Sequence, residues 1–171
     1  MSSTDDDVRL FLALWPGRTA QAQALACQSA QPWPAEARLV APGNLHVTLH
    51  FLGNVPRHRL PDLCSGLDVS PARVAVTLDH LELWQRGIAV LTAATAPPAL
   101  SALHARLADR LRSLGLRVED RPYRPHMTLA RKSAGVAFRP VRPVKLQTAQ
   151  YALVESRGGK YTKVCWYRRG T

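Results

Sequence analysis

A four-residue pattern that occurs twice constrains the fold of this chain more than any other feature. Both copies read His-x-Thr-Leu, at His46–Leu49 and at His126–Leu129, with the two histidines 80 positions apart. Two copies of a short pattern at a wide spacing indicate an internal duplication. Alternate residues of a strand face the same way, so each histidine shares a face with its threonine while the apolar residues take the other face. We therefore expect two equivalent strands, each with its apolar face in the core and its His–Thr face in a functional site.

The remaining sequence predicts strands and helices around these two strands. Apolar runs and turn signals indicate strands at 8–14, 38–40, 45–52, 73–84, 87–94, 126–131, 145–155 and 161–167, and helices at 18–31, 57–67 and 97–114. Tight turns at 85–86 and 156–159 predict hairpins, and hairpins imply mainly antiparallel pairing. The length of 171 residues suits a single two-lobed domain over 1–171, with residues 1–7 as a flexible tail.

The charge and the cysteine content indicate which partners the protein binds and in which compartment it works. The excess of 23 Lys+Arg over 12 Asp+Glu, a net charge of +11, favours phosphate-rich partners, although a generally basic composition explains it as well. Three widely spaced cysteines with no Cys-x-x-Cys pair predict neither a zinc site nor a disulfide framework, and favour the reducing cytoplasm. We find no signal peptide and no apolar run long enough to cross a membrane, so we expect no membrane contact.

The duplicated pattern indicates acid/base chemistry on a phosphodiester. The unperturbed pKa of histidine is about 6.5, so one ring can accept a proton while the other donates one, without a metal or another cofactor. If the two strands face each other, His46 and His126 flank a phosphorus atom, and the hydroxyls of Thr48 and Thr128 donate hydrogen bonds to its oxygens. The chain has no Gly-x-Ser-x-Gly elbow and no Walker glycine loop, which excludes those nucleophile and nucleotide sites.

Four further residues are candidates for contacts with the substrate. Arg131 carries a guanidinium fork that matches phosphate oxygens. Strand alternation would point it away from the preceding histidine, so we expect a twist, a bulge or the strand end after Leu129. Phe11 and Tyr123 are candidates for stacking on a base, and His50 for bordering the cleft. A zinc site made by His46, His50 and His126 is an alternative, but no carboxylate or cysteine accompanies either motif.

Four segments resemble a known family. Residues 8–14, 42–53, 121–131 and 151–156 are similar to the bacterial and archaeal RNA 2′,3′-cyclic phosphodiesterases, also called 2′-5′ RNA ligases, of the two-histidine phosphoesterase superfamily. The resemblance implies an α+β fold of two pseudo-symmetric lobes, each a mainly antiparallel sheet with helices on its outer face, enclosing a central cleft. It also implies His46 and His126 as the catalytic pair, with phosphate contacts from Thr48, Thr128 and Arg131.

The resemblance implies hydrolysis of a terminal 2′,3′-cyclic phosphate of RNA, such as a tRNA fragment, to a 2′-phosphate, with reversible 2′-5′ ligation as a second reaction. We assign His46 as the proton donor and His126 as the proton acceptor, and the symmetry of the motifs leaves the reverse open. Two other functions stay open: an RNA or nucleotide binding module without chemistry, and a phosphodiesterase for another small cyclic phosphate. No stripe for self-association is apparent, so we expect a monomer.

Overall fold

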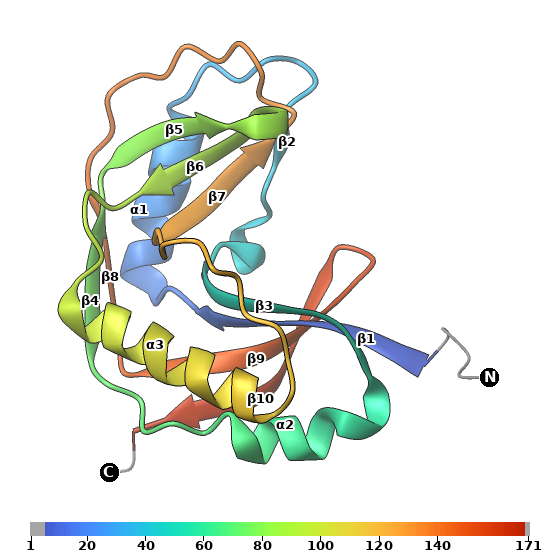
Figure 1. Cartoon of the computed structure of the whole chain (residues 1–171). Helices are drawn as coiled ribbons and strands as arrows, with labels where there is room; N and C mark the ends of the chain where they lie inside the picture. The colour runs from blue at the N-terminus through green and yellow to red at the C-terminus, as the bar shows by residue number, and fades with distance from the viewer. Residues whose placement is uncertain (1–5, 170–171) are drawn as a thin grey trace.

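The structure, a computed structural model that describes residues 6–169, is an α+β fold built mainly from antiparallel strands (Figure 1). The strands are β1 (Asp7–Leu14), β2 (Arg38–Leu39), β3 (Val47–Pro56), β4 (Val74–Leu78), β5 (His80–Trp84), β6 (Ile88–Thr92), β7 (His126–Arg131), β8 (Val144–Thr148), β9 (Gln150–Arg157) and β10 (Lys160–Arg168). The helices are α1 (Arg18–Ser29), α2 (Leu60–Gly66) and α3 (Pro98–Ser113), with 3-10 turns at Pro42–Asn44, Arg57–Arg59 and Gln85–Gly87. The expected fold class is confirmed.

The main sheet has the order β10-β9-β1-β3-β7-β6-β5, with β2 on β7, and it divides into two lobes. The lobes meet where β3 pairs with β7 through a single pair, Val47 opposite Met127. Helices α2 and α3 cover one lobe and α1 covers the other (Figure 1). Hydrogen bonds hold helices of both lobes against the sheet. Gln28 on α1 donates to the Leu129 carbonyl of β7, and His50 on β3 bonds to the His104 carbonyl of α3.

Strand β1 shows how the core sets the two faces of the sheet. Leu10, Leu12 and Leu14 are buried in the main core beneath the helices. Phe11 and Ala13 belong to a separate small cluster on the opposite face, together with residues of β9. This second face carries the two motif histidines, so the apolar alternation of one strand decides on which side of the sheet the site lies.

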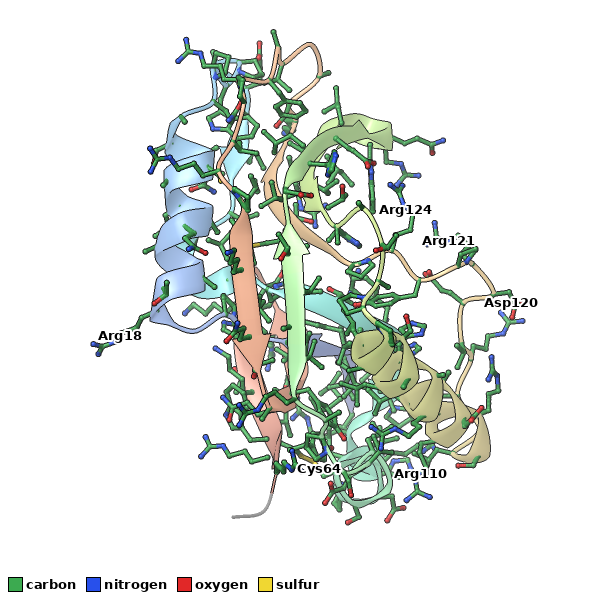
Figure 2. All side chains as sticks on the ribbon, turned by 90° about the vertical axis from the view of Figure 1, so that its left-hand side faces the viewer. Arg18, Cys64, Arg110, Asp120, Arg121 and Arg124 are labelled. Carbon is green, nitrogen blue, oxygen red and sulfur yellow. A yellow bond between two sulfur atoms is a disulfide. The ribbon has the colours of Figure 1, made fainter. Side chains whose placement is uncertain are left out.

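Two expected long strands are each divided in the structure. The segment 73–84 forms β4 and β5, and 145–155 lies in β8 and β9, with β4 and β8 paired in their own two-stranded sheet. Figure 2 shows this small sheet between α1 and α3. At the second break the Thr148 hydroxyl hydrogen-bonds the backbone of Gln150, a local bond that turns the chain out of one sheet and into the next.

The expected helix at 57–67 is confirmed as a 3-10 turn followed by α2, with Pro61 in the first turn. The predicted tail of residues 1–7 falls largely outside the described residues, and Asp7 already belongs to β1. The prediction of no disulfide is wrong: Cys64 on α2 (Figure 2) is bonded to Cys165 on β10, with 6.0 Å between their Cα atoms. The packing of α2 against β10 brings together two cysteines 101 positions apart. Within residues 6–169, no helix combines the length and apolarity that crossing a membrane requires.

Candidate active site

The pairing of Val47 with Met127 places both motifs on one face of the sheet. Antiparallel register then sets His46 opposite Thr128 and Thr48 opposite His126, all on the face away from the main core. The two histidines are diagonal neighbours in this arrangement, a relation that separates backbones by roughly 7–8 Å. The two His–Thr pairs are therefore brought together, with each histidine beside the threonine of the other strand.

Both motif strands contain a bulge at the same motif position, the leucine. On β3, Leu12 and Ala13 of β1 face His50 and Thr48, so Leu49 is the extra residue. On β7, Val90 and Ala89 of β6 face Thr128 and Ala130, so Leu129 is the extra residue. The expected irregularity near Leu129 is therefore present, and the bulge is duplicated together with the motif. A bulge re-aims the side chains that follow it, and the charge of Arg131 acts on His46.

The two motif histidines share the same tautomer-fixing contact. Nδ1 of His46 lies 2.6 Å from the Asn44 carbonyl oxygen, and Nδ1 of His126 lies 2.8 Å from the Arg124 carbonyl oxygen. A carbonyl only accepts, so each Nδ1 carries a proton and Nε2 is left for chemistry. Nε2 of His46 contacts the Thr48 hydroxyl at 3.0 Å. The equivalent bonds orient two rings whose reactive nitrogens are both Nε2.

Each motif histidine packs against a tryptophan that also faces a cation. The ring of His46 is stacked on Trp15 with centroids 5.0 Å apart, and Lys163 Nζ lies 4.1 Å from the centroid of Trp15. The ring of His126 lies 4.4 Å from Trp84, which faces Arg124 at 5.3 Å. Both tryptophans end a Leu-x-Leu-Trp sequence, at 12–15 and 81–84, a second duplicated pattern that sequence reasoning missed. Trp84 is the last residue of β5, whereas Trp15 directly follows the last residue of β1.

A carboxylate anchors the surroundings of His126. Glu82 accepts hydrogen bonds from Trp84 Nε1 at 2.7 Å and from Arg124 at 2.8 Å and 3.0 Å. Arg124 and Arg121 both lie on the loop that enters β7 (Figure 2). The Trp84 hydrogen bond is the main cause that holds the pKa of Glu82 below its usual value, so the side chain stays charged and keeps its partners in place.

The pKa values of both motif histidines are lowered in the free protein. Burial is the main cause for His46, whose pKa falls to about 4, and the charges of His126, Arg131 and Lys163 lower it further against the bond to the Asn44 carbonyl. Burial also lowers the pKa of His126, while the Arg124 carbonyl and Glu82 raise it. An anion placed between the rings would raise both pKa values, since it stabilises the imidazolium form.

The three candidates for base or cleft contacts lie in two different places. Phe11 is buried beside His46, with ring centroids 5.0 Å apart, so it packs against the histidine ring. His50, turned by the bulge at Leu49, instead stacks on His104 at 3.9 Å, and Tyr123 stacks on the same ring at 4.0 Å. The structure thus corrects the expectation for His50, and it also removes the alternative of three converging histidine ligands.

We expect this buried stack to make folding sensitive to acid. Burial, and then the charge of His50, lower the pKa of His104 to about 4. The unfolded chain binds the proton near pH 6.5, so stability present above that pH is lost as the pH falls towards 4. The unfolding midpoint of His104→Phe, which keeps an aromatic ring but cannot titrate, should fall less steeply over this range. The exposed His58→Phe should keep the slope of the unmodified protein; equal slopes for all three would contradict the account.

Two antiparallel lobes that each contribute one His-x-Thr-Leu strand define the class of this protein. A family model described as the 2′-5′ RNA ligase superfamily matches residues 16–155, and the chain belongs to that family. It is 31% identical over 129 residues to an RNA 2′,3′-cyclic phosphodiesterase of Escherichia coli, covering 74% of this chain and 73% of the relative. It is 33% identical over 113 residues to one of Geobacillus stearothermophilus, covering 60% of this chain but only 34% of that relative.

The solved structures include a similar fold at nearly full length. The crystal structure of E. coli LigT complexed with 3′-AMP matches with a TM-score of 0.84 and 25% identity, and the match covers 96% of this chain and 99% of that one. The expected family is therefore confirmed by sequence and by fold.

Proposed function

We propose that the protein hydrolyses the 2′,3′-cyclic phosphate at an RNA end to a 2′-phosphate, with His46 and His126 as a metal-independent acid/base pair. The observation that carries this proposal is the single β3–β7 pair, which sets two His–Thr pairs around one position. The names of the E. coli and Geobacillus relatives support the reaction, and the 3′-AMP complex of LigT supports a nucleotide as ligand.

In the proposed step, Nε2 of neutral His126 takes a proton from water as its oxygen attacks phosphorus. The bond from phosphorus to the 3′-oxygen breaks, and protonated His46 gives its proton to that oxygen, leaving a 2′-phosphate. The proton gained by His126 and lost by His46 then exchanges with solvent. Replacing the water by the 5′-hydroxyl of a second RNA gives a 2′-5′ linkage through the same proton transfers, which accounts for ligation as a second, reversible reaction.

Binding of the substrate supplies the charge state that this mechanism needs. At neutral pH the lowered pKa of His46 leaves its ring mainly neutral in the free protein. The anionic phosphate raises that pKa and so favours the protonated donor. Thr48 and Thr128 donate to the non-bridging oxygens, and Arg131 adds a fixed positive charge where negative charge develops. These side chains together perform each task that a metal would otherwise perform.

The test is incubation with an RNA that carries a 2′,3′-cyclic phosphate, in the presence of EDTA. We expect conversion to a 2′-monophosphate, followed by phosphorus NMR or by the mobility of the labelled RNA. Tight binding without conversion would show a binding module. Turnover of a cyclic mononucleotide alone would show a phosphodiesterase for small cyclic phosphates, and loss of activity in EDTA would contradict the metal-free mechanism.

A further inference from the structure

Strand β10 leads away from the candidate active site and carries aromatic and cationic side chains along one face. It is an edge strand, antiparallel to β9, and the β9–β10 hairpin rises beside β1 and β3 (Figure 1). Asn44 donates to the carbonyl of Gly159 at 3.2 Å, which ties the hairpin tip to the loop before the first motif. The beginning of β10 is therefore fixed at the rim of the site.

The register of β10 decides which of its side chains face the site. Lys163 pairs with Val154 and Trp166 pairs with Ala152, and both partners belong to the small cluster on the face of the motif histidines. Residues opposite each other in an antiparallel pair share a face. Tyr167, by contrast, stacks on Tyr151 in the main core. Lys163 and Trp166 therefore lie on the same side of the sheet as His46.

The near end of this face is already part of the surroundings of His46. The ring of Tyr161 lies 5.5 Å from that of His46 and 5.1 Å from that of Phe11. Lys163 covers Trp15 and lowers the pKa of His46 through its charge. Aromatic and cationic groups thus already alternate where the terminal nucleotide would bind.

The far end of β10 carries a further aromatic and cationic pair and borders an arginine-rich hollow beside α3. Trp166 is 38% exposed, a large value for a tryptophan, and the guanidinium of Arg168 lies 5.5 Å from its ring centroid. Arg168 also lines a hollow of about 580 Å³ with Arg73, Arg106 and Arg169, in which Asp68 is the single carboxylate. Within residues 6–169 none of these four arginines forms an ion pair. Their charges are therefore available to an anionic partner.

We infer that this face of β10, here called the β10 track (Tyr161, Lys163, Trp166 and Arg168), binds the single-stranded RNA that precedes the terminal cyclic phosphate. Aromatic faces stack on any base and arginine forks match phosphate oxygens, so alternation of the two fits a flexible polynucleotide strand. At roughly 3.3 Å per residue, the distance from Tyr161 to Arg168 is about 20 Å, which exceeds a single nucleotide. The inference rests on the proposed function and adds that a polynucleotide, rather than a mononucleotide, is the preferred substrate.

The test compares two substrates with the same reacting group: a nucleoside 2′,3′-cyclic phosphate and a short single-stranded RNA that ends in it. We expect Trp166→Ala and Arg168→Ala each to raise KM for the RNA by roughly tenfold, since stacking and phosphate contacts are lost. Values of kcat and KM for the mononucleotide should stay unchanged. Trp166→Phe should restore RNA binding, and Arg117→Ala, an exposed arginine in the loop after α3, should change neither substrate.

Equal effects on both substrates would overturn the inference, as would an unchanged KM for the RNA or a change in oligomeric state in Trp166→Ala. A separate measurement tests RNA binding without any reaction: fluorescence anisotropy with the same RNA ending in a 3′-hydroxyl. Arg168→Ala should weaken this binding and reduce the slope of log K against log salt by about 0.7, the value for one lost contact to a single strand. Weakened RNA binding without any hydrolysis by the unmodified protein would sink the proposed function while supporting the track.

Discussion

Replacing either motif histidine by alanine is expected to reduce turnover of an RNA 2′,3′-cyclic phosphate by roughly 10²–10⁴-fold, the usual contribution of one general acid or base. The loss should appear in kcat, because His46 and His126 act on protons that move only in the transition state. Since both rings serve one concerted step, the double variant should lose much less than the product of the two single effects. Single-turnover rates measured with a labelled RNA would give these numbers.

The matched control is His58→Ala, an exposed histidine on the turn after β3. It should keep the activity of the unmodified protein. The unfolding midpoint of each variant should be measured as well, because His46 is packed against Trp15 and Phe11 and its removal leaves a gap. Near-normal turnover in either motif variant would show that the two rings do not carry the reaction.

Much of the site could be predicted because strand periodicity is a local property. Alternation alone places each motif histidine and threonine on one face, and the structure brings the two pairs together across Val47 and Met127. The bulge near Leu129 could also be predicted, from the conflict between the alternation and the expected role of Arg131. The matching bulge at Leu49 was missed, although the duplication implied it, and for that reason His50 was placed on the wrong face.

The supporting residues were harder to predict because they come from distant elements. Trp15 follows β1 and Trp84 ends β5, and only their shared Leu-x-Leu-Trp sequence signals a common role. Pairing of Cys64 with Cys165 depends on how α2 packs, which no local pattern encodes. The divided strands were missed for a related reason. A strand-like sequence continues through 73–84, while its hydrogen-bonding partner changes from β8 to β6. Sheet membership is a long-range property.

The motif sequence and the pKa of His46 bear differently on which histidine is the acid and which is the base. The motif symmetry favours neither ring. In the free protein the pKa of His46 falls to about 4, and a ring that is mainly neutral at neutral pH is suited to accept a proton. Our assignment of His46 as donor therefore requires that the bound phosphate reverse this preference, and an experiment that removes the need for an acid can decide between the two roles.

A substrate in which sulfur replaces the 3′-bridging oxygen provides that experiment. A thiolate leaves without protonation, because thiols have pKa values near 8.5 and are far more acidic than alcohols. With this substrate we expect His46→Ala to recover, so that its defect shrinks from roughly 10²–10⁴-fold to nearly none. His126→Ala should keep its full defect, since the attacking water still has to lose a proton. Rescue of His126→Ala in place of His46→Ala would reverse the two roles while leaving the acid/base pair intact. Rescue of neither variant would mean that protonation of the leaving oxygen does not limit the reaction, and that the rings act by orienting the phosphate.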